Sequence, residues 1–326
     1  MISSMRGISF ALFLLANGGS AYAATPDSFN IYIQKAVAEL NSKFAGKGYD
    51  IKKAYTHAYD YADGQIKPTD APWTMCVAAV AEVITTAINI YVKETDDKSP
   101  YSALPVAGWN RMRPTDIRSH IWVDPRLDSY GTGDALVTFG VGKRVPFSEL
   151  TPGSFINLNR NRPGRKPSGH AVVFQSFIDK DGKELSAYSD KVVGFRYFSS
   201  QGSGNSPGAG FGYRYAFFNK SNNEEYCPTL DGGRRVDCGV MYSKGQKLLN
   251  TGYMLHPSKW DADARSRNLK SVVDGVYVQV RSRGDGNFIG IPGAESLSPD
   301  SFATKLLEQD TMMLNPIFDE ANTGGD

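Results

Sequence analysis

One of the three cysteines in the chain, Cys76, is a candidate nucleophile because the other two can pair with each other. Cys227 and Cys238 flank a turn-rich segment, Pro228 to Asp237, that could close a hairpin. In an oxidising compartment they are expected to form a disulfide, whose reduction should loosen the hairpin without stopping catalysis. Cys76 then remains a free thiol, which is either buried or chemically active.

A base for the thiol can be found in the sequence. Cys76 follows Thr74, a potential N-cap, at the start of an apolar stretch that predicts a buried helix, Met75 to Val92. The helix N-terminus favours thiolate, so Cys76 is expected to react with thiol reagents below the usual pH range. His170 begins an apolar strand directly after the Pro- and Gly-rich loop Arg160 to Gly169. The expected chemistry is attack on a carbonyl by Cys76, with His170 as base.

The elements that must position these residues read as helices first and strands afterwards. Helical periodicity predicts an N-terminal amphipathic helix up to Phe44 and a second helical stretch over Tyr130 to Gly140. Strands are predicted after Gly153, from His170 to Ile178, and over residues 192–200 and 213–218. This order predicts an α+β fold with an antiparallel sheet. We divide the chain into an N-terminal helical segment (24–65), a core that carries the site (66–220), and a disulfide hairpin with a C-terminal extension (221–326).

Residues 1–23 have the pattern of a secretory signal peptide: a basic start, a short apolar run and the ending Ala21-Tyr22-Ala23. The expected mature protein begins at Ala24 and is periplasmic or secreted. The apolar run is shorter than the roughly 20 residues of a membrane span, and no later segment is expected to insert into a membrane. A net charge of +2 gives no indication of nucleic-acid binding.

Three stretches resemble the NlpC-type and CHAP-type cell-wall peptidases and amidases of the papain-like clan: Trp73 to Val77, Leu150 to Phe155, and Ser168 to Phe174. In that clan a helix carries the cysteine, a Pro-Gly-Asp turn opens the first core strand, and the histidine begins the next strand. This chain departs from the pattern with Ser154 in place of the acid. The resemblance covers roughly residues 72–215. It implies a papain-like NlpC/CHAP-type core, whose nucleophile helix packs on an antiparallel sheet, with an N-terminal helix and C-terminal additions.

The resemblance also implies a third polar residue, which orients the histidine from a following strand. Gln201 is the first choice, because it ends the predicted strand that returns to the same edge of the sheet. Asn205 and Asp179 are the alternatives. Trp73 and Tyr197, with the loop at residues 160–169, are expected to form walls of the substrate pocket.

The implied activity is hydrolysis of amide bonds in peptidoglycan stem peptides, through a thioacyl intermediate on Cys76 and without a cofactor. The expected partners are peptidoglycan or its peptide fragments and, for an antibacterial effector, an immunity or inhibitor protein. A transglutaminase or acyltransferase of the same fold is one alternative, and a non-catalytic cell-wall-binding module is another.

A metal site is not expected. His57, His120 and His256 read as exposed or loop histidines, and no pair has the spacing of metal ligands. Cys227 and Cys238 lack a neighbouring paired histidine, which argues against a zinc site. The glycine-rich stretch after Gln201 lacks the lysine and the following helix of a phosphate loop, and reads as a mobile lip of the cleft.

Overall fold

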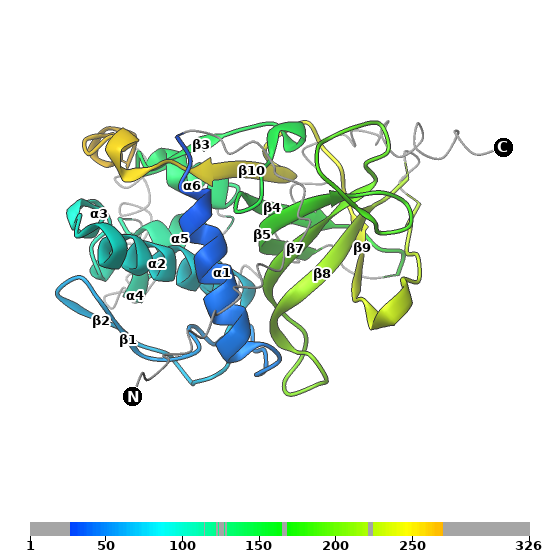
Figure 1. The fold of residues 1–326 in the computed structure, drawn as a ribbon, viewed down its shortest axis with the longest axis horizontal. Helices are drawn as coiled ribbons and strands as arrows, with labels where there is room; N and C mark the ends of the chain where they lie inside the picture. Colours follow the sequence, from blue (N-terminus) through cyan, green and yellow to red (C-terminus); the bar gives the residue numbers. More distant parts are fainter. Residues whose placement is uncertain are drawn as a thin grey trace, which may run out of the picture.

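The computed structural model describes residues 27–269, apart from residues 114, 122, 124–126, 128, 165–167 and 221–223. The predicted signal peptide with its cleavage site, and the part of the predicted C-terminal extension after residue 269, lie outside the described residues. The fold is α+β, as predicted: helices gather on one side of a large sheet (Figure 1). The described part forms one body with a continuous core beneath the helices.

Two helices cover the face of the sheet that matters for the site. They are α1 (Asn30–Phe44) and α2 (Cys76–Thr95), and both contribute to the same hydrophobic core. Helix α2 is apolar on nearly all sides because it is surrounded by protein. By length and hydropathy it could cross a membrane, but 83% of the apolar window is buried inside the fold, which is the environment of a core helix.

The start of α2 differs in one detail from the prediction. Its N-cap is Met75, and no side chain caps it. Thr74 is not the cap, because its hydroxyl accepts a hydrogen bond from the N–H of Tyr55 (3.1 Å) instead. Ser200 holds the same turn by donating to the carbonyl of Thr74 (2.7 Å). The start of the helix is therefore fixed to the preceding chain and to the sheet.

Shorter elements surround this core. They are β1 (Tyr59–Tyr61), β2 (Gly64–Ile66), α3 (Ser99–Ala103), α4 (Ala107–Asn110), α5 (Ile117–Ile121), α6 (Thr132–Thr138), and the 3₁₀ turns η2 (Phe147–Glu149), η3 (Asp231–Gly233) and η4 (Pro257–Lys259). Helix α6 is the second predicted helix, and it is shorter than the predicted 130–140.

The large sheet has the strand order β3-β10-β4-β9-β8-β7-β5-β6, and β4 also pairs with β5. Strands β4, β5, β7, β8 and β9 therefore close into a ring. The strands are β3 (Gly142–Arg144), β4 (Phe155–Arg160), β5 (Ser168–Ile178), β6 (Glu184–Leu185), β7 (Gly194–Gln201), β8 (Gly210–Phe218), β9 (Val236–Val240) and β10 (Leu249–Met254).

The prediction of a purely antiparallel sheet is wrong for one pair. Strands β8 and β9 are parallel, because the chain between them returns before it enters the sheet again. Strand β9 belongs to the region that the sequence places outside the core, as does β10, which pairs with β3 and β4. The region after residue 220 thus completes the sheet.

Alternation along β5 defines its two faces. Ala171 and Val173 belong to the core under α1 and α2, whereas Val172 and Phe174 belong to a second core inside the ring. By this alternation the side chain of His170 lies on the ring side of β5, and Cys76 approaches from the helix side.

Candidate active site

The Cys76 thiol contacts the backbone of β5 beside His170, near the end of β5 from which the neighbouring strand β7 separates, but no hydrogen bond joins the Cys76 sulfur to the His170 imidazole. The pair of β5 and β7 residues nearest to this end is Val173 and Phe198, and Val173 is three positions after His170 in the chain. Beyond that point the carbonyl of Ala171 accepts a hydrogen bond from the Ser199 hydroxyl (2.7 Å). The N–H of Ala171 lies beside the Cys76 sulfur. The nucleophile candidate is therefore next to the backbone of the residue that follows the base candidate.

The environment of the Cys76 thiol favours its neutral form. Burial raises the pKa of the thiol, and the Ala171 N–H, the Arg160 guanidinium and the N–H groups of the first helical turn oppose this effect only in part. The helix N-terminus lowers the pKa of the thiol, as predicted. Desolvation raises it by more, because Cys76 is only 3% exposed. The raised pKa of the thiol argues against the predicted reactivity below the usual thiol pH range.

His170 is also held in its neutral form. Burial lowers the pKa of the imidazole well below its ordinary value, and the Arg160 and Arg214 charges lower it further. Asp237 and the hydrogen bond between the imidazole and Gln201 act in the opposite direction and raise the pKa. The ring packs edge-on to Tyr197, with centroids 5.7 Å apart, and its Nε2 is buried without a hydrogen-bond partner. A neutral imidazole with an unpartnered nitrogen can accept a proton.

A buried polar cluster lies behind His170. The Asp237 carboxylate accepts hydrogen bonds from Arg160 Nη2 (2.6 Å) and from the Tyr197 hydroxyl (2.8 Å). Gln201 Oε1 lies 2.7 Å from the same hydroxyl and 3.3 Å from Arg160 Nη2. We call Arg160, Tyr197, Gln201 and Asp237 the Arg–Asp cluster. Tyr197 was predicted as a pocket wall, but its side chain has no exposed surface and belongs to this cluster.

Of the three choices for the orienting residue, Gln201 is the one beside His170. Asp179 follows the opposite end of β5, where it accepts hydrogen bonds from the N–H groups of Asp181 and Lys183 in a turn. Asn205 is exposed, on the loop after β7. Asp179 is therefore at the far end of β5 from the imidazole, whereas Asn205 lies beside Gly48 and Trp73.

Tyr49, from the segment after α1, lies over the Cys76 sulfur. Burial and the adjacent Cys76 thiol raise the pKa of the Tyr49 hydroxyl, which is hydrogen-bonded to that thiol. Backbone hydrogen bonds of 3.0 Å join Tyr49 and Gly204 in both directions. The loop that contains Gly204 was predicted to be a mobile lip, but it is tied to the segment after α1.

Trp73 is partly exposed and lies beside this junction. Gly48 has a φ of +111°, and a Cβ there would lie 3.1 Å from Trp73 Nε1. The close approach of the chain to the indole therefore favours glycine at this position. Trp73 is at the surface near Cys76, which is compatible with its predicted place in a pocket wall.

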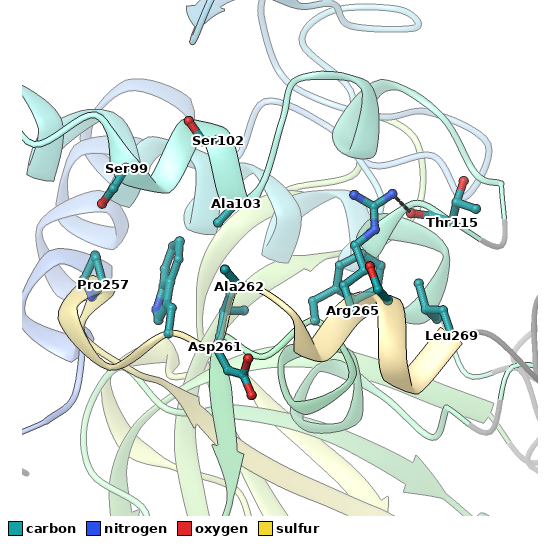
Figure 2. Close-up of a pocket in the computed structure, with 13 residues that line it drawn as sticks. Ser99, Ser102, Ala103, Thr115, Pro257, Asp261, Ala262, Arg265 and Leu269 are labelled. Atoms are coloured by element: carbon teal, nitrogen blue, oxygen red, sulfur yellow. Dashed lines mark hydrogen bonds between the residues drawn. The ribbon is translucent and has the colours of Figure 1, made fainter.

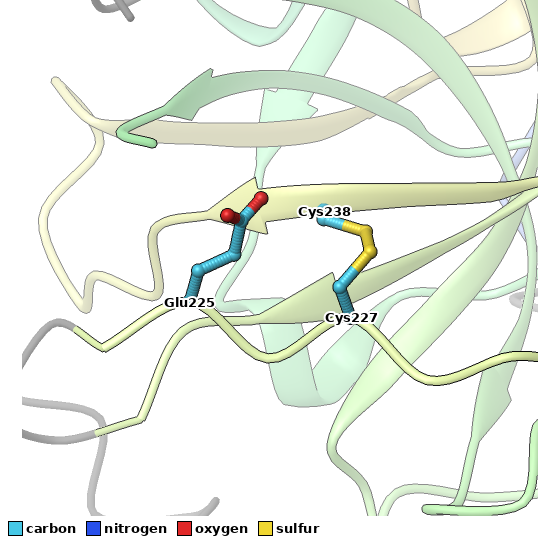
Figure 3. Close-up of side chains that lie close together, drawn as sticks. All are labelled: Glu225, Cys227 and Cys238. Atoms are coloured by element: carbon cyan, nitrogen blue, oxygen red, sulfur yellow. A yellow bond between two sulfur atoms is a disulfide. The ribbon is translucent and has the colours of Figure 1, made fainter. Parts of the chain in front are cut away.

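The disulfide prediction is confirmed. Cys227 and Cys238 are bonded, with Cα atoms 5.2 Å apart, and Cys76 is free. Glu225 lies beside the pair (Figure 3), but sulfurs bonded to each other offer no thiolate to a metal ion.

One of the other three histidines has a different environment from that expected. His120 is fully buried on α5, with its ring 5.3 Å from that of Phe139, so the prediction of an exposed histidine is wrong there. His57 is partly exposed, 3.3 Å from Glu82, and His256 accepts a hydrogen bond from the N–H of Ser258. Each has a local structural contact.

A cavity of about 830 Å³ lies elsewhere in the molecule, between α3 and the chain around η4 (Figure 2). Trp260, Arg265 and Phe139 are among its lining residues, which include none of the predicted site residues. Arg265 donates to the carbonyl of Thr115 (2.7 Å) at its rim. The cavity does not give access to Cys76.

Sequence reasoning missed Tyr49 and Asp237 as residues of the site, and it predicted Arg160 only as part of a loop in the pocket wall. Arg160 was assigned to a loop and Asp237 to the disulfide hairpin, because only the strand pairing brings them together. The presence of a buried-strand pattern around Asp237 could have suggested that its charge needs a partner. Comparison of the chain with protein-family models, curated proteins and solved structures found no match.

Proposed function

We propose that this protein is an exported cysteine hydrolase with a papain-like NlpC/CHAP-type core, which cleaves amide bonds in peptidoglycan stem peptides. One observation carries the proposal. The first residue of α2, Cys76, lies against the backbone of β5 directly after His170, and Gln201 lies beside the imidazole. A thiol at a helix N-terminus, an imidazole and an orienting polar side chain are the groups that such an enzyme needs.

In the proposed reaction His170 removes the thiol proton while the Cys76 sulfur attacks the amide carbonyl carbon. The C–N bond then breaks, the leaving amine takes the proton from His170, and a thioester remains on Cys76. Water, activated by His170, hydrolyses this thioester and restores the thiol. The Cys76 N–H and the Tyr49 hydroxyl are candidate donors to the oxyanion.

The pKa directions favour general-base catalysis over a preformed thiolate–imidazolium pair. Burial raises the pKa of the Cys76 thiol and lowers that of His170, so both groups are neutral at rest. Proton transfer must therefore accompany the attack. Because Cys76 and His170 are only 3% and 6% exposed, substrate must displace the cover that Tyr49 provides.

The proposal places the enzyme in the periplasm or outside the cell, which the disulfide fits. Its substrates are peptidoglycan or peptide fragments of it. If it is an antibacterial effector, an immunity or inhibitor protein is an additional partner.

A non-catalytic cell-wall-binding module is the second candidate. It is favoured by the low exposure of Cys76 and by the raised pKa of its thiol, which are also properties of a structural cysteine.

Mass analysis of purified peptidoglycan after incubation tests the proposal and names the bond. We expect new fragments from the wild type and none from Cys76→Ala, with His256→Ala as a control that retains activity. Cleavage by Cys76→Ala would exclude the proposed nucleophile. Binding without fragments would favour the second candidate, and fragments joined to an added amine would identify an acyltransferase.

A further inference from the structure

The Arg–Asp cluster contains a buried ion pair that the proposed reaction does not use. Arg160 and Asp237 have side chains that are 14% and 4% exposed. Removing two charges from water costs several kcal/mol per ion, by order of magnitude, and apolar replacements of such pairs are often as stable. Stability alone therefore gives no reason for a charged pair at this place in the sheet.

The hydrogen bonds of the pair lead to His170. Arg160, from β4, donates through Nε (3.0 Å) and Nη2 (2.6 Å) to the same Asp237 oxygen, from β9. The Nη2 group also donates to Gln201 Oε1 (3.3 Å), and the Tyr197 hydroxyl lies within 2.8 Å of both Gln201 and Asp237 acceptor oxygens. The amide that contacts the imidazole is thus fixed by the ion pair and its tyrosine.

We propose that Arg160 and Asp237 are positioning residues of the Cys76–His170 site, which act through Gln201 and Tyr197. The inference rests on the proposed function, because it assigns these residues to the same site. Arg162 completes the arrangement by donating to the second Asp237 oxygen (2.8 Å) and to the Cys238 carbonyl (2.7 Å). Four strands of the ring, β4, β5, β7 and β9, therefore contribute to one assembly.

The two charges of the pair act on the site in opposite directions. Arg160 favours thiolate at Cys76 and disfavours a charged His170, whereas Asp237 favours a charged His170. The other titratable groups that face the site are Arg214 on β8, Tyr197 on β7 and Tyr49. Removing one member of the pair should therefore shift the titration of the thiol, with a sign that depends on which member is removed.

The test measures the rate of Cys76 alkylation by iodoacetamide in the full mature protein as a function of pH. Asp237→Asn leaves the Arg160 charge uncompensated, so we expect the midpoint of the profile to move to lower pH. Arg160→Met removes the cation beside the sulfur, so we expect a move to higher pH. A shift of about one pH unit would change the rate about tenfold on the rising part of the profile.

A matched control is the pair Asp134 and Arg144, which also joins a buried carboxylate to an arginine but lies outside the cluster. Asp134→Asn and Arg144→Met should leave the alkylation profile at the wild-type midpoint. If Asp237→Asn and Arg160→Met shift the midpoint in the same direction, or not at all, the inference is wrong.

A second comparison keeps the inference testable if Asp237→Asn does not fold. Arg160→Lys retains the charge, so its midpoint should stay near that of the wild type, whereas that of Arg160→Met should not. Equal profiles for these two variants would overturn the inference. The assay needs no peptidoglycan, so failure of the wild type to cleave peptidoglycan would refute the proposed function without deciding the alkylation result.

Discussion

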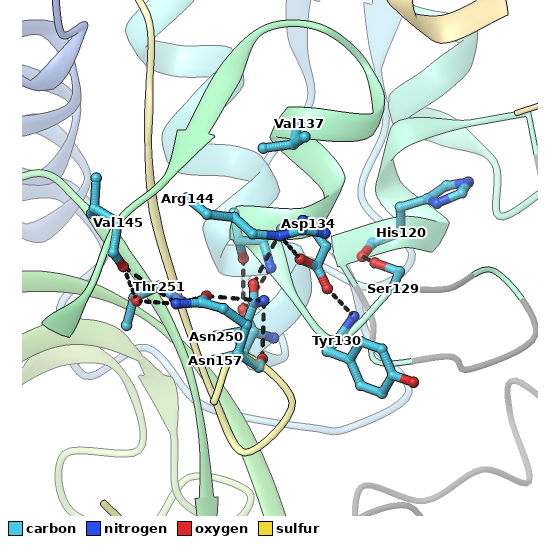
Figure 4. A network of polar contacts seen from close by, with 12 residues as sticks. His120, Ser129, Tyr130, Asp134, Val137, Arg144, Val145, Asn157, Asn250 and Thr251 are labelled. Carbon is cyan, nitrogen blue, oxygen red and sulfur yellow. Dashed lines mark hydrogen bonds and ion pairs between the residues drawn. The ribbon is translucent and has the colours of Figure 1, made fainter. Parts of the chain in front are cut away.

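Two buried polar regions lie on the large sheet, and they are built on different principles. One is the Arg–Asp cluster behind His170. The other, which we call the β10 network, joins β4, β10 and α6 (Figure 4). Its members are Thr132, Asp134, Asn157, Gln246, Asn250 and Thr251.

In the β10 network, amide side chains satisfy backbone groups. Asn157 Oδ1 accepts hydrogen bonds from the N–H and the hydroxyl of Thr132, both 2.8 Å, at the start of α6. Asn250, opposite Asn157 in the sheet, accepts from the N–H of Asp134 (3.2 Å). Gly131 permits this approach, because it has a φ of +149° and a Cβ there would lie 2.4 Å from Asn157 Cγ. These contacts attach α6 to the sheet.

The two regions differ in the charge of their buried side chains and in whether each buried polar atom has a hydrogen-bond partner. The β10 network consists mainly of neutral amides and hydroxyls, and its one charged member, Asp134, pairs with Arg144, whose side chain is 46% exposed. The Arg–Asp cluster instead surrounds two buried charges and leaves His170 Nε2 without a partner. A satisfied network holds elements together, whereas an unsatisfied titratable group with a displaced pKa is typical of a functional site.

The largest expected difference between the regions is in catalysis. Cys76→Ala and His170→Ala should each abolish hydrolysis, with a loss of at least about 10⁴-fold in kcat, because nucleophile and base act as a unit. Both proteins should still unfold cooperatively. We would measure release of peptidoglycan fragments and urea unfolding on the same samples. Full activity in either variant would remove the distinction that we draw between the two regions.

Removing the disulfide should affect both stability and the site. For Cys227→Ser with Cys238→Ser we expect a loss of about 3 kcal/mol in the free energy of unfolding, by the chain-entropy model. Because Asp237 directly precedes Cys238, we also expect lower activity. This reverses the view from sequence that the hairpin is separate from catalysis. Urea unfolding measures the loss of stability, and release of peptidoglycan fragments measures activity. An unchanged kcat in a folded double variant would show that the hairpin is separate from catalysis.

Alanine substitution of one amide side chain from each region, Gln201 and Asn250, should separate an effect on kcat from an effect on stability. Gln201→Ala should reduce kcat by about 10- to 100-fold, since misplacement of a catalytic group by about 1 Å has an effect of this size. Asn250→Ala should cost about 1–3 kcal/mol of stability, because it leaves the Asp134 N–H unpaired, with kcat unchanged. The comparison needs kcat and urea unfolding for both. The opposite pattern, with kcat lost in Asn250→Ala and kept in Gln201→Ala, would contradict our assignment.

The smallest expected effect is on the pH dependence of stability. The folded pKa of His170 lies well below the ordinary 6.5, so the unfolded chain binds a proton first as pH falls. The contribution of neutral His170 is present above about pH 6.5 and is lost below it, by at most about 1.4 kcal/mol per pH unit. His170→Gln should therefore lose less stability than the wild type between pH 7 and pH 5. Parallel curves in urea titrations would show that His170 is not the group responsible.

Local patterns in the sequence were sufficient to predict several parts of the site. The apolar stretch after Met75 predicted a buried helix with Cys76 in its first turn, and the run after Gly169 predicted the strand that holds His170. Parity of the cysteines predicted the disulfide between Cys227 and Cys238. Each of these depends on residues that are close in sequence or on a simple count.

The remaining parts depend on contacts between distant segments. Arg160 and Asp237 are 77 residues apart, and they meet only because β9 enters the sheet beside β4 and parallel to β8. The raised pKa of the Cys76 thiol depends on how deeply α2 and the segment around Tyr49 bury the sulfur. Neither strand order nor burial can be read from a pattern within one element.

The place of the disulfide has a consequence for when the proposed enzyme becomes active. Cys238 is in β9 next to Asp237, and it is bonded to a segment outside the sheet. A newly made chain in a reducing cytoplasm would lack this bond, and β9 would be held only by its pairing and its ion pair. If Asp237 positions the site and the protein is exported as we propose, activity would mature only after oxidation of the two cysteines. The enzyme would then be inactive in the reducing cytoplasm of the cell that makes it and active only in an oxidising compartment.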